Sequence, residues 1–180
     1  MTRPELDVAV DPARRLVFAA GPTLYGASAD FLAAPLGYGV YRWTETSVEV
    51  ASDRSVWVTD ADYDVPSPGH GHLTQFREDG TQLASFDLPA QPMAVRVHPR
   101  TGDVWVSLTG NILRFDGTTL HTVGFERSGF DLAPDYETDG VWVVSGENVV
   151  LVAPDGAVTR LHPLLSSRTD QRYLRVVPPT

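Results

Sequence analysis

The tripeptide Val-Trp-Val occurs three times in this 180-residue chain, each time in the same local context. An alternating apolar segment and a turn come before each copy, and a further strand-like segment follows it. The copies are centred on Trp57, Trp105 and Trp142, and the turns before them contain Asp53, His98 and Asp135. A similar unit near the N-terminus has Asp11 at its turn and Phe18 in its aromatic strand. A strand–turn–strand unit that recurs about every 40 residues indicates a repeat protein.

Three of the four units continue with two more strand-like segments joined by an Asp-Gly pair, which is typical of two-residue hairpin loops. These pairs are Asp79-Gly80, Asp116-Gly117 and Asp155-Gly156. A small four-stranded sheet cannot bury both faces alone, so neighbouring units must stack against it. The sequence therefore predicts an all-β fold, a β-propeller of about four four-stranded antiparallel blades, with the tryptophans filling the space between blades. The runner-up is a β-sandwich, which also has many short strands at regular spacing.

The repeats are predicted to form one domain over residues 1–180. They occupy residues 5–46, 47–90, 91–127 and 128–164, and a lone strand follows at 172–178. The first repeat is expected to lack its outer strand, because its assigned third strand at 39–44 runs directly into the next repeat. Open blade edges are templates for further pairing. Three arrangements would cover them: the last strand closes a small ring, two copies join as a homodimer, or the chain forms part of a larger propeller.

The charge of the chain limits its partners. The net charge is −9, and the 14 basic residues are all arginines scattered singly along the chain. This pattern excludes a nucleic-acid or anionic-membrane footprint and favours cations or basic partners. The absence of cysteine excludes disulfides and thiolate metal sites. No segment has the apolar length of a membrane span or of a signal peptide, which predicts a cytoplasmic protein.

Residues 72–108, "HLTQFREDGTQLASFDLPAQPMAVRVHPRTGDVWVSL", resemble the NHL and virginiamycin-B-lyase-like propeller repeats. The shared pattern is a strand with an Asp-Gly hairpin, a following strand, a proline that opens an apolar strand, and a turn before an aromatic strand. The resemblance implies a ring that usually closes with six blades, so that four repeats would form part of one. It transfers no catalytic residue, because no glutamate follows the aromatic strands here as it does in the "WFTE"-like strand of the lyases.

Two connections between second and third strands are long, at residues 21–37 and 60–72. Insertions on one face of a repeat protein mark its binding face. We therefore expect a binding or scaffold module that engages a protein or a small-molecule ligand through this face. The alternative is that the apolar segment at 21–37 folds over its own blade as an Ω-loop, with Ser28 capping a short helix.

Three repeats place an acid four residues before the turn: Asp7, Glu49 and Asp131. The third repeat has Ala94 there, and Arg96, two residues further on, is placed to reach a neighbouring carboxylate. Acids that converge at the mouth of a propeller channel would bind Ca²⁺ or Mg²⁺ through their oxygens. The alternative is that they accept hydrogen bonds from backbone amides of the next blade.

The segment "DADYDVPSPGHGH" gives a second candidate metal site, consisting of Asp60, Asp62, Asp64, His70 and His72. Alternating aspartates can present several oxygens to Ca²⁺, and His-x-His can chelate a transition metal. The alternative is a set of solvated loop acids beside a flexible Gly-His pair. A catalytic base would distinguish a metal-dependent lactonase- or lyase-like enzyme from a binding module. His70 and His72 are the nearby candidates, whereas His98 is expected to be a turn residue.

Overall fold

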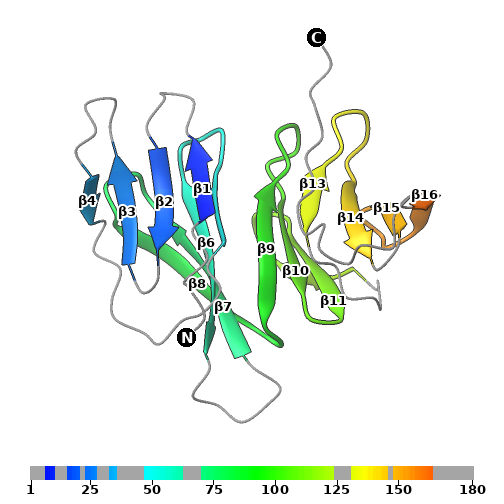
Figure 1. The fold of residues 1–180 in the computed structure, drawn as a ribbon, viewed down its shortest axis with the longest axis horizontal. Helices are drawn as coiled ribbons and strands as arrows, with labels where there is room; N and C mark the ends of the chain where they lie inside the picture. The colour runs from blue at the N-terminus through cyan, green and yellow to red at the C-terminus, as the bar shows by residue number, and fades with distance from the viewer. Residues whose placement is uncertain are drawn as a thin grey trace. The chain divides into compact units, whose positions relative to one another are not determined.

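The computed structural model describes residues 7–10, 16–20, 23–27, 33–35, 47–62, 70–123, 131–145 and 148–163. These residues form sixteen strands in four antiparallel sheets of four strands each (Figure 1). In every sheet the strands lie side by side in the order in which they follow along the chain. The described residues include no helix long and apolar enough to cross a membrane. The prediction of about four four-stranded antiparallel units is confirmed.

We number the sheets 1 to 4 along the chain. Sheet 1 contains β1 (Asp7–Val10), β2 (Leu16–Ala20), β3 (Thr23–Ala27) and β4 (Ala33–Pro35). Sheet 2 contains β5 (Ser47–Val50), β6 (Val56–Asp62), β7 (His70–Phe76) and β8 (Gln82–Leu88). Sheet 3 contains β9 (Pro92–Val97), β10 (Val104–Leu108), β11 (Asn111–Phe115) and β12 (Leu120–Thr122). Sheet 4 contains β13 (Leu132–Pro134), β14 (Val141–Ser145), β15 (Asn148–Val152) and β16 (Val158–Pro163).

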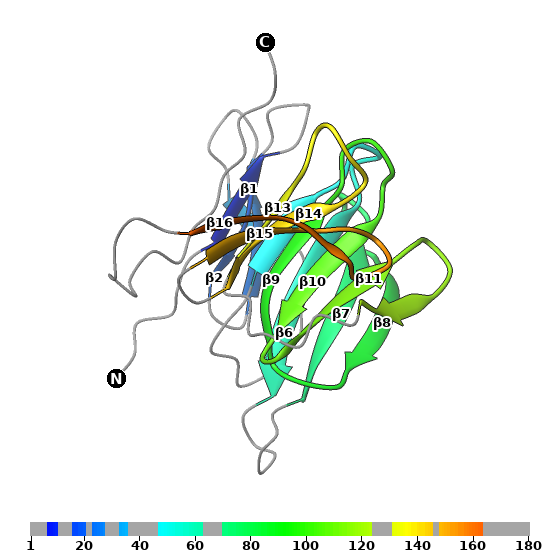
Figure 2. The same cartoon turned by 90° about the vertical axis from the view of Figure 1, so that its right-hand side faces the viewer.

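The chain divides into two compact units, Met1–Val95 and Arg96–Thr180. The first unit holds sheets 1 and 2, and the second holds sheet 4 and most of sheet 3. The boundary falls within β9. Figure 2 shows the same strands after a turn of 90° about the vertical axis.

Sheet 1 differs from the prediction in two ways. The segment at 21–37 was expected to be a loop, but it contains β3 and β4, so the sheet has its outer strand. The alternating pattern of "TLYGA" is short, and the surrounding Gly and Pro residues obscured it. In addition, Phe18 is not the counterpart of the tryptophans. The residue paired with Ala9 is Val17, just as the residue paired with Ala133 is Trp142, so the register gives the tryptophan position to Val17 and not to Phe18. The expected features at Ser28, 39–44 and 172–178 lie outside the described residues.

The Asp-Gly hairpins form, but two of the three have longer loops than predicted. The amide of Arg77 donates to the carbonyl of Thr81, and that of Ala153 to Ala157, so each loop has three residues and ends at a glycine. Gly80 and Gly156 have φ angles of 86° and 88°, the left-handed conformation of the third loop residue. The loop at Gly117 is closed between Asp116 and Thr119, so it has two residues, as predicted, but they are Gly117 and Thr118 and not the Asp116-Gly117 pair.

The turn between β5 and β6 has the same three-residue form, with Arg54 in the left-handed position at φ 71°. Its closing residue is Ala51, whereas the turns of sheets 3 and 4 close at His98 and Asp135. Ala51, and not Asp53, is therefore the counterpart of His98 and Asp135. The predicted alignment of sheet 2 was wrong by two residues, because Asp53 looked like the repeated turn aspartate.

Each unit has an apolar core between two sheets. In the first unit, Ala9 of β1 packs with residues on one face of sheet 2, which are Val48, Val56, Val58 and Phe76. In the second unit, sheet 3 contributes Trp105, Ile112 and Val123, and sheet 4 contributes Leu132, Val141, Val143, Val150 and Val152. Trp105 is fully buried there, which confirms its prediction as a residue between sheets. Trp57 is also buried, whereas Trp142 is only half-buried.

Candidate functional site

A row of three polar residues crosses sheet 2 near the end where β6 leads into β7. Asp60 of β6 pairs with His72 of β7, and His72 pairs with Asp87 of β8. Residues directly opposite each other on neighbouring strands project from the same face of a sheet. The three side chains therefore lie next to one another because of the strand register alone. We call them the Asp60–His72–Asp87 row.

The row runs from a buried carboxylate to a solvated one. The Asp60 side chain is 1% exposed, and its Oδ1 accepts hydrogen bonds from the His72 backbone N–H and from His72 Nδ1, both at 3.0 Å. His72 is 37% exposed, and its Nε2 lies 3.5 Å from Oδ1 of Asp87, whose side chain is 99% exposed. A buried carboxylate must be hydrogen-bonded, and His72 supplies two of its donors. The imidazole thus lies between two carboxylates, with Nδ1 towards Asp60 and Nε2 towards Asp87.

Gly71, which precedes His72, is required by close packing. A Cβ at this position would meet the carbonyl oxygen of Asp60 and the ring of Pro92. The glycine thus allows the first residue of β9 to approach β7 beside the row. The backbone beside the row is therefore closely packed against the start of β9.

The structure changes the interpretation of the segment at 60–72. It was expected to be a loop, with solvated acids as the alternative to a metal site. Instead β6 continues to Asp62, and β7 begins at His70, which is paired with Asp62. Asp60 and His72 are therefore strand residues joined by hydrogen bonds. His70 is exposed. The side chain of Asp62 and the whole of Asp64 lie outside the described residues.

The predicted acid ring has a different register from the one expected. Glu49 is paired with Trp57, whereas the residue paired with Trp142 is Ala133, two residues after Asp131. The counterpart of Asp131 in sheet 2 is therefore Ser47, not Glu49. Ser47 Oγ accepts a hydrogen bond of 3.2 Å from the Val95 amide, which links sheet 2 to β9 within the first unit.

Asp131 is buried and forms an ion pair with Arg96 at 2.9 Å. The expectation that Arg96 reaches a neighbouring carboxylate is thus confirmed. Asp131 Oδ1 also accepts the Leu132 amide at 2.8 Å. Of Asp7, only the backbone is described, and it pairs with Ala19.

No group of three or more His, Asp or Glu side chains with the spacing of a metal site occurs among the residues whose side chains are described. The side chain of Asp7, from the predicted acid ring, and those of Asp62 and Asp64, from the predicted site at 60–72, lie outside that set. The assignment of Ca²⁺ or Mg²⁺ to these residues stays a prediction.

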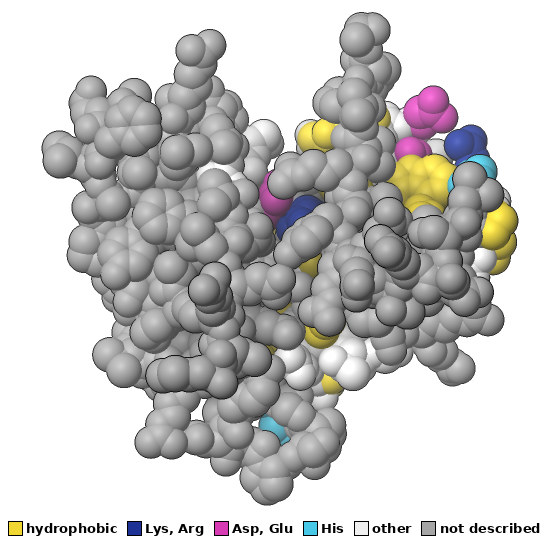
Figure 3. Space-filling model, viewed as in Figure 1, with side chains coloured by type: hydrophobic (Ala, Val, Ile, Leu, Met, Phe, Trp, Pro, Cys, Tyr) yellow, Lys and Arg dark blue, Asp and Glu magenta, His cyan; other side chains and the backbone are white. Residues whose placement is uncertain are grey.

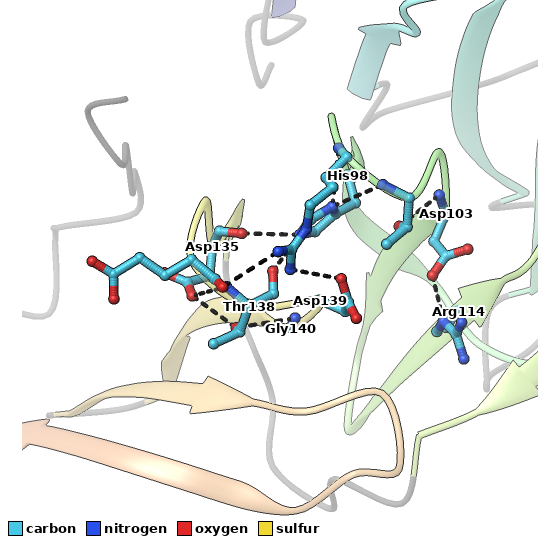
Figure 4. A network of polar contacts seen from close by, with 10 residues as sticks. His98, Asp103, Arg114, Asp135, Thr138, Asp139 and Gly140 are labelled. Carbon is cyan, nitrogen blue, oxygen red and sulfur yellow. Dashed lines mark hydrogen bonds and ion pairs between the residues drawn. The ribbon is translucent and has the colours of Figure 1, made fainter. Parts of the chain in front are cut away.

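A second polar network surrounds His98 in the second unit (Figure 4). His98 is fully buried, and its Nε2 donates to the backbone carbonyls of Asp135 and Thr138, both at 2.9 Å. Its Nδ1 accepts the amides of Arg100 and Thr101 at 3.3 Å. His98 is a turn residue, as predicted. It also connects the turn after β9 to the turn after β13, a role that the sequence did not indicate.

Asp135 holds the second of these turns together. Its carboxylate accepts hydrogen bonds from the amide and hydroxyl of Thr138 and, at 2.9 Å, from Nε1 of Trp142. Burial alone would raise the pKa of Asp135, but the hydrogen bonds from Thr138 and Trp142 outweigh it and hold the pKa below its ordinary value. Because His98 and Asp135 are buried and their hydrogen bonds are made within the second unit, we interpret this network as structural. The Asp60–His72–Asp87 row reaches solvent at Asp87 and is the better candidate for contact with a ligand.

Comparison with known proteins identifies the fold. No protein-family model matches the chain, and no curated protein matches it either. Among solved structures, a catalytically inactive virginiamycin B lyase from Staphylococcus aureus with quinupristin superposes with a TM-score of 0.69 at 12% identity, over 92% of this chain and 58% of that chain. A gluconolactonase from Xanthomonas campestris superposes with a TM-score of 0.64 at 21% identity, over 88% of this chain and 61% of that chain. BBS1N in complex with ARL6DN superposes with a TM-score of 0.63 at 14% identity, over 89% of this chain and 54% of that chain.

The four described sheets are thus blades of the β-propeller type, consistent with part of a propeller, and not the two packed sheets of a β-sandwich. The predicted resemblance to virginiamycin-B-lyase-like propellers is confirmed at the level of the fold. The chain spans about three fifths of the length of the solved structures that it matches. These similar structures include two enzymes and a protein-binding propeller.

Proposed function

We propose that the protein is a propeller-type binding module that engages a protein or small-molecule ligand through the end of sheet 2 where β6 leads into β7. The observation that carries this proposal is the Asp60–His72–Asp87 row. It combines a fixed hydrogen-bonding group, the His72 imidazole held by Asp60, with the solvated carboxylate of Asp87. A contact group held in place by its neighbours binds at a lower cost in conformational entropy than a free one.

The charge of the protein indicates what kind of ligand fits this end of the sheet. A net charge of −9 attracts cationic partners at long range, and Asp87 offers an exposed carboxylate at short range. A guanidinium group has several N–H donors for the exposed carboxylate of Asp87, and the planar His72 ring lies beside that carboxylate. The similarity to BBS1N, a propeller in complex with ARL6DN, supports a protein as the partner. We therefore propose an arginine-containing segment of a partner protein as the ligand.

Binding of an arginine-rich peptide tests this proposal by titration calorimetry, with an acidic peptide of equal length as the comparison. We expect the basic peptide alone to bind, and Asp87→Asn and His72→Gln each to weaken it by about tenfold, equivalent to roughly 1.4 kcal/mol. Glu137→Gln is the matched control, because it also removes one negative charge from an exposed residue, but in a turn of sheet 4. Equal weakening by all three variants would mean that net charge, and not the row, attracts the peptide, and would refute the proposal.

A second candidate function is a divalent-metal-dependent lactonase- or lyase-like enzyme. The observation in its favour is that a buried carboxylate orients His72, because an imidazole held in this way is suited to act as a general base. Similarity to a virginiamycin B lyase and to a gluconolactonase also supports it. The metal, Ca²⁺ or Mg²⁺, would be held by one of the two predicted sites. The first consists of Asp7, Glu49 and Asp131, and the second of Asp60, Asp62, Asp64, His70 and His72.

Lactone hydrolysis in the presence of Ca²⁺ or Mg²⁺ tests this second candidate. An enzyme of this kind should lose its activity both on addition of a chelator and in the His72→Gln variant. The unfolding midpoint should also rise with either ion, because a ligand stabilises the state that binds it. If neither ion changes the unfolding midpoint or the rate of lactone hydrolysis, the enzyme hypothesis is refuted and the binding function is favoured.

A further inference from the structure

The Asp60–His72–Asp87 row ends on β8, the outer strand of sheet 2. The edge of β8 that faces away from β7 pairs with no strand among the residues that the structure describes. Of the four outer strands β8 is the longest, with seven residues, whereas β4 and β12 have three each and β16 has six. A strand edge of this kind presents backbone N–H and C=O groups with which a further strand can pair.

The hydrogen bond of the His72 amide shows which backbone groups of β8 point outwards. The N–H of His72 donates to Asp60 on β6, so the backbone of His72 is directed towards β6 and away from β8. His72 and Asp87 are therefore a non-hydrogen-bonded pair of the antiparallel ladder, and Asp87 directs its own N–H and C=O away from β7. Ser85, two residues earlier in the same register, does the same, whereas Phe86 directs its backbone towards β7. Ser85 and Asp87 thus present their backbone groups at the outer edge.

The two long outer strands, β8 and β16, differ in how their edges are protected. Exposed edges are commonly protected against pairing by basic side chains, prolines and bulges. In β16 the Arg160 side chain is 52% exposed, Pro163 has no N–H, and the register with β15 shifts within the strand. Basic and histidine side chains lie at the surface in the region of β14–β16 (Figure 3). In contrast, β8 contains no basic residue and no proline, and its register shift lies before Ala84, so the part from Ala84 to Leu88 is regular.

We propose that the arginine-containing segment of the partner protein binds as an additional strand alongside β8, paired with the backbone of Ser85 and Asp87. This inference rests on the proposed function and specifies how the ligand is held. The arginine lies opposite Asp87, whose side chain is 99% exposed, because oppositely charged residues directly across two strands attract each other.

The register of β8 also determines which residues of the segment flank the arginine. Successive side chains of a strand point to opposite faces of the sheet, so the two neighbours of the arginine project away from Asp87. On that opposite face β8 carries Ala84 and Phe86, both of which are half-buried. Apolar neighbours would extend the cover of these two side chains. The ligand is therefore an extended segment with an apolar residue on each side of its arginine.

Titration calorimetry with a peptide of ~9 residues tests this arrangement, since strands in proteins have about this length. In the peptide, valine and threonine alternate, and an arginine replaces the central threonine. Ser85→Pro should weaken binding by at least about tenfold, because proline removes the outward N–H and its ring obstructs the edge. Ser85→Ala is the matched control and should bind like the parent. Both variants remove the contact of 3.1 Å between the hydroxyl groups of Ser85 and Thr74, so that they differ only in the backbone.

Hydrogen exchange of the unaltered protein gives a second measurement, which decides the question alone if Ser85→Pro does not fold. On addition of the peptide the amides of Ser85 and Asp87 should exchange at least about tenfold more slowly, because they become bonded to it. The amide of Phe86, directed towards β7, and the amides of β16 should keep their rates.

Failure of strand addition and failure of the proposed function give different results. If the peptide does not bind the parent protein, arginine recognition is refuted and strand addition with it. If the peptide binds and Asp87→Asn weakens it, but the amides of Ser85 and Asp87 gain no protection and Ser85→Pro binds as well as Ser85→Ala, then arginine recognition stands and strand addition is refuted.

Discussion

Replacing the buried tryptophans by phenylalanine tests whether the indole N–H groups, and not only the ring volumes, determine the stability of the second unit. Trp105 is fully buried, and its Nε1 has no hydrogen-bond partner among the described residues. Trp142 is less buried, but its Nε1 donates to the Asp135 carboxylate at 2.9 Å. Burial and hydrogen bonding therefore predict opposite rankings for the two variants.

The magnitudes favour the hydrogen-bond ranking. Trp105→Phe leaves part of the site unfilled, at a cost of about 1 kcal/mol, but it also removes an unsatisfied buried N–H whose burial costs about 1–3 kcal/mol. We expect the free energy of unfolding to stay within about 1 kcal/mol of the parent. Trp142→Phe removes a hydrogen bond to a charged acceptor and should cost about 1.5–3 kcal/mol. Trp105→Ala should cost about 3–5 kcal/mol, because it opens a cavity between sheets 3 and 4.

Urea unfolding followed by far-UV circular dichroism is the appropriate assay, because tryptophan fluorescence itself changes in these variants. The slopes of the transitions should agree, so that midpoints report stability. If Trp105→Phe is as destabilising as Trp105→Ala, or more destabilising than Trp142→Phe, then the N–H groups do not have the roles assigned to them.

Three further predictions concern single residues. Arg54→Gly should raise the thermal unfolding midpoint. It relieves a left-handed conformation that costs about 1–2 kcal/mol, whereas the exposed ion pair with Glu78 that it removes contributes about 0–1 kcal/mol. Arg54→Ala should lower the midpoint, because it removes the ion pair and keeps the left-handed conformation. Gly71→Ala should lower the free energy of unfolding by about 1–3 kcal/mol in thermal melts, because the added methyl group meets Asp60 and Pro92. The pKa of Asp135 in the folded state lies below its ordinary value of 3.8. Its contribution to stability is therefore complete above pH 3.8 and is lost as the pH falls towards the folded-state pKa. Asp135→Asn should reduce the slope of the free energy of unfolding against pH in this acid range.

The strand pattern of the chain predicted most of the fold. The repeated strand–turn–strand unit gave the four sheets and the place of Trp105, because hydrophobic alternation and turn residues depend on local sequence. The prediction was wrong where different residues fill the same backbone position. Ala51 occupies the turn-closing position that His98 and Asp135 fill in sheets 3 and 4, and Asp53 was taken for it, which placed Glu49 in a row to which it does not belong. In sheet 1, Gly and Pro made two short strands resemble a loop.

The candidate site was only partly predictable. The sequence singled out Asp60 and His72, but it placed them in a loop, since it does not show how far β6 and β7 continue. Asp87 was missed because it belongs to a different strand and becomes a neighbour only through the register of β7 and β8. A count of residues back from the Asp79-Gly80 hairpin would have placed Asp87 close to His72.

The boundary between the two compact units falls inside β9, between Val95 and Arg96. The Val95 amide is bonded to Ser47 of the first unit, and the next side chain, Arg96, is bonded to Asp131 of the second. Opening of either unit must therefore disturb the same strand. Native-state hydrogen exchange should show similar protection for the amides of Val95 and Val97, on either side of this boundary, and the units should unfold in one cooperative transition. Residues of β9 thus take part in the hydrogen bonding of both units.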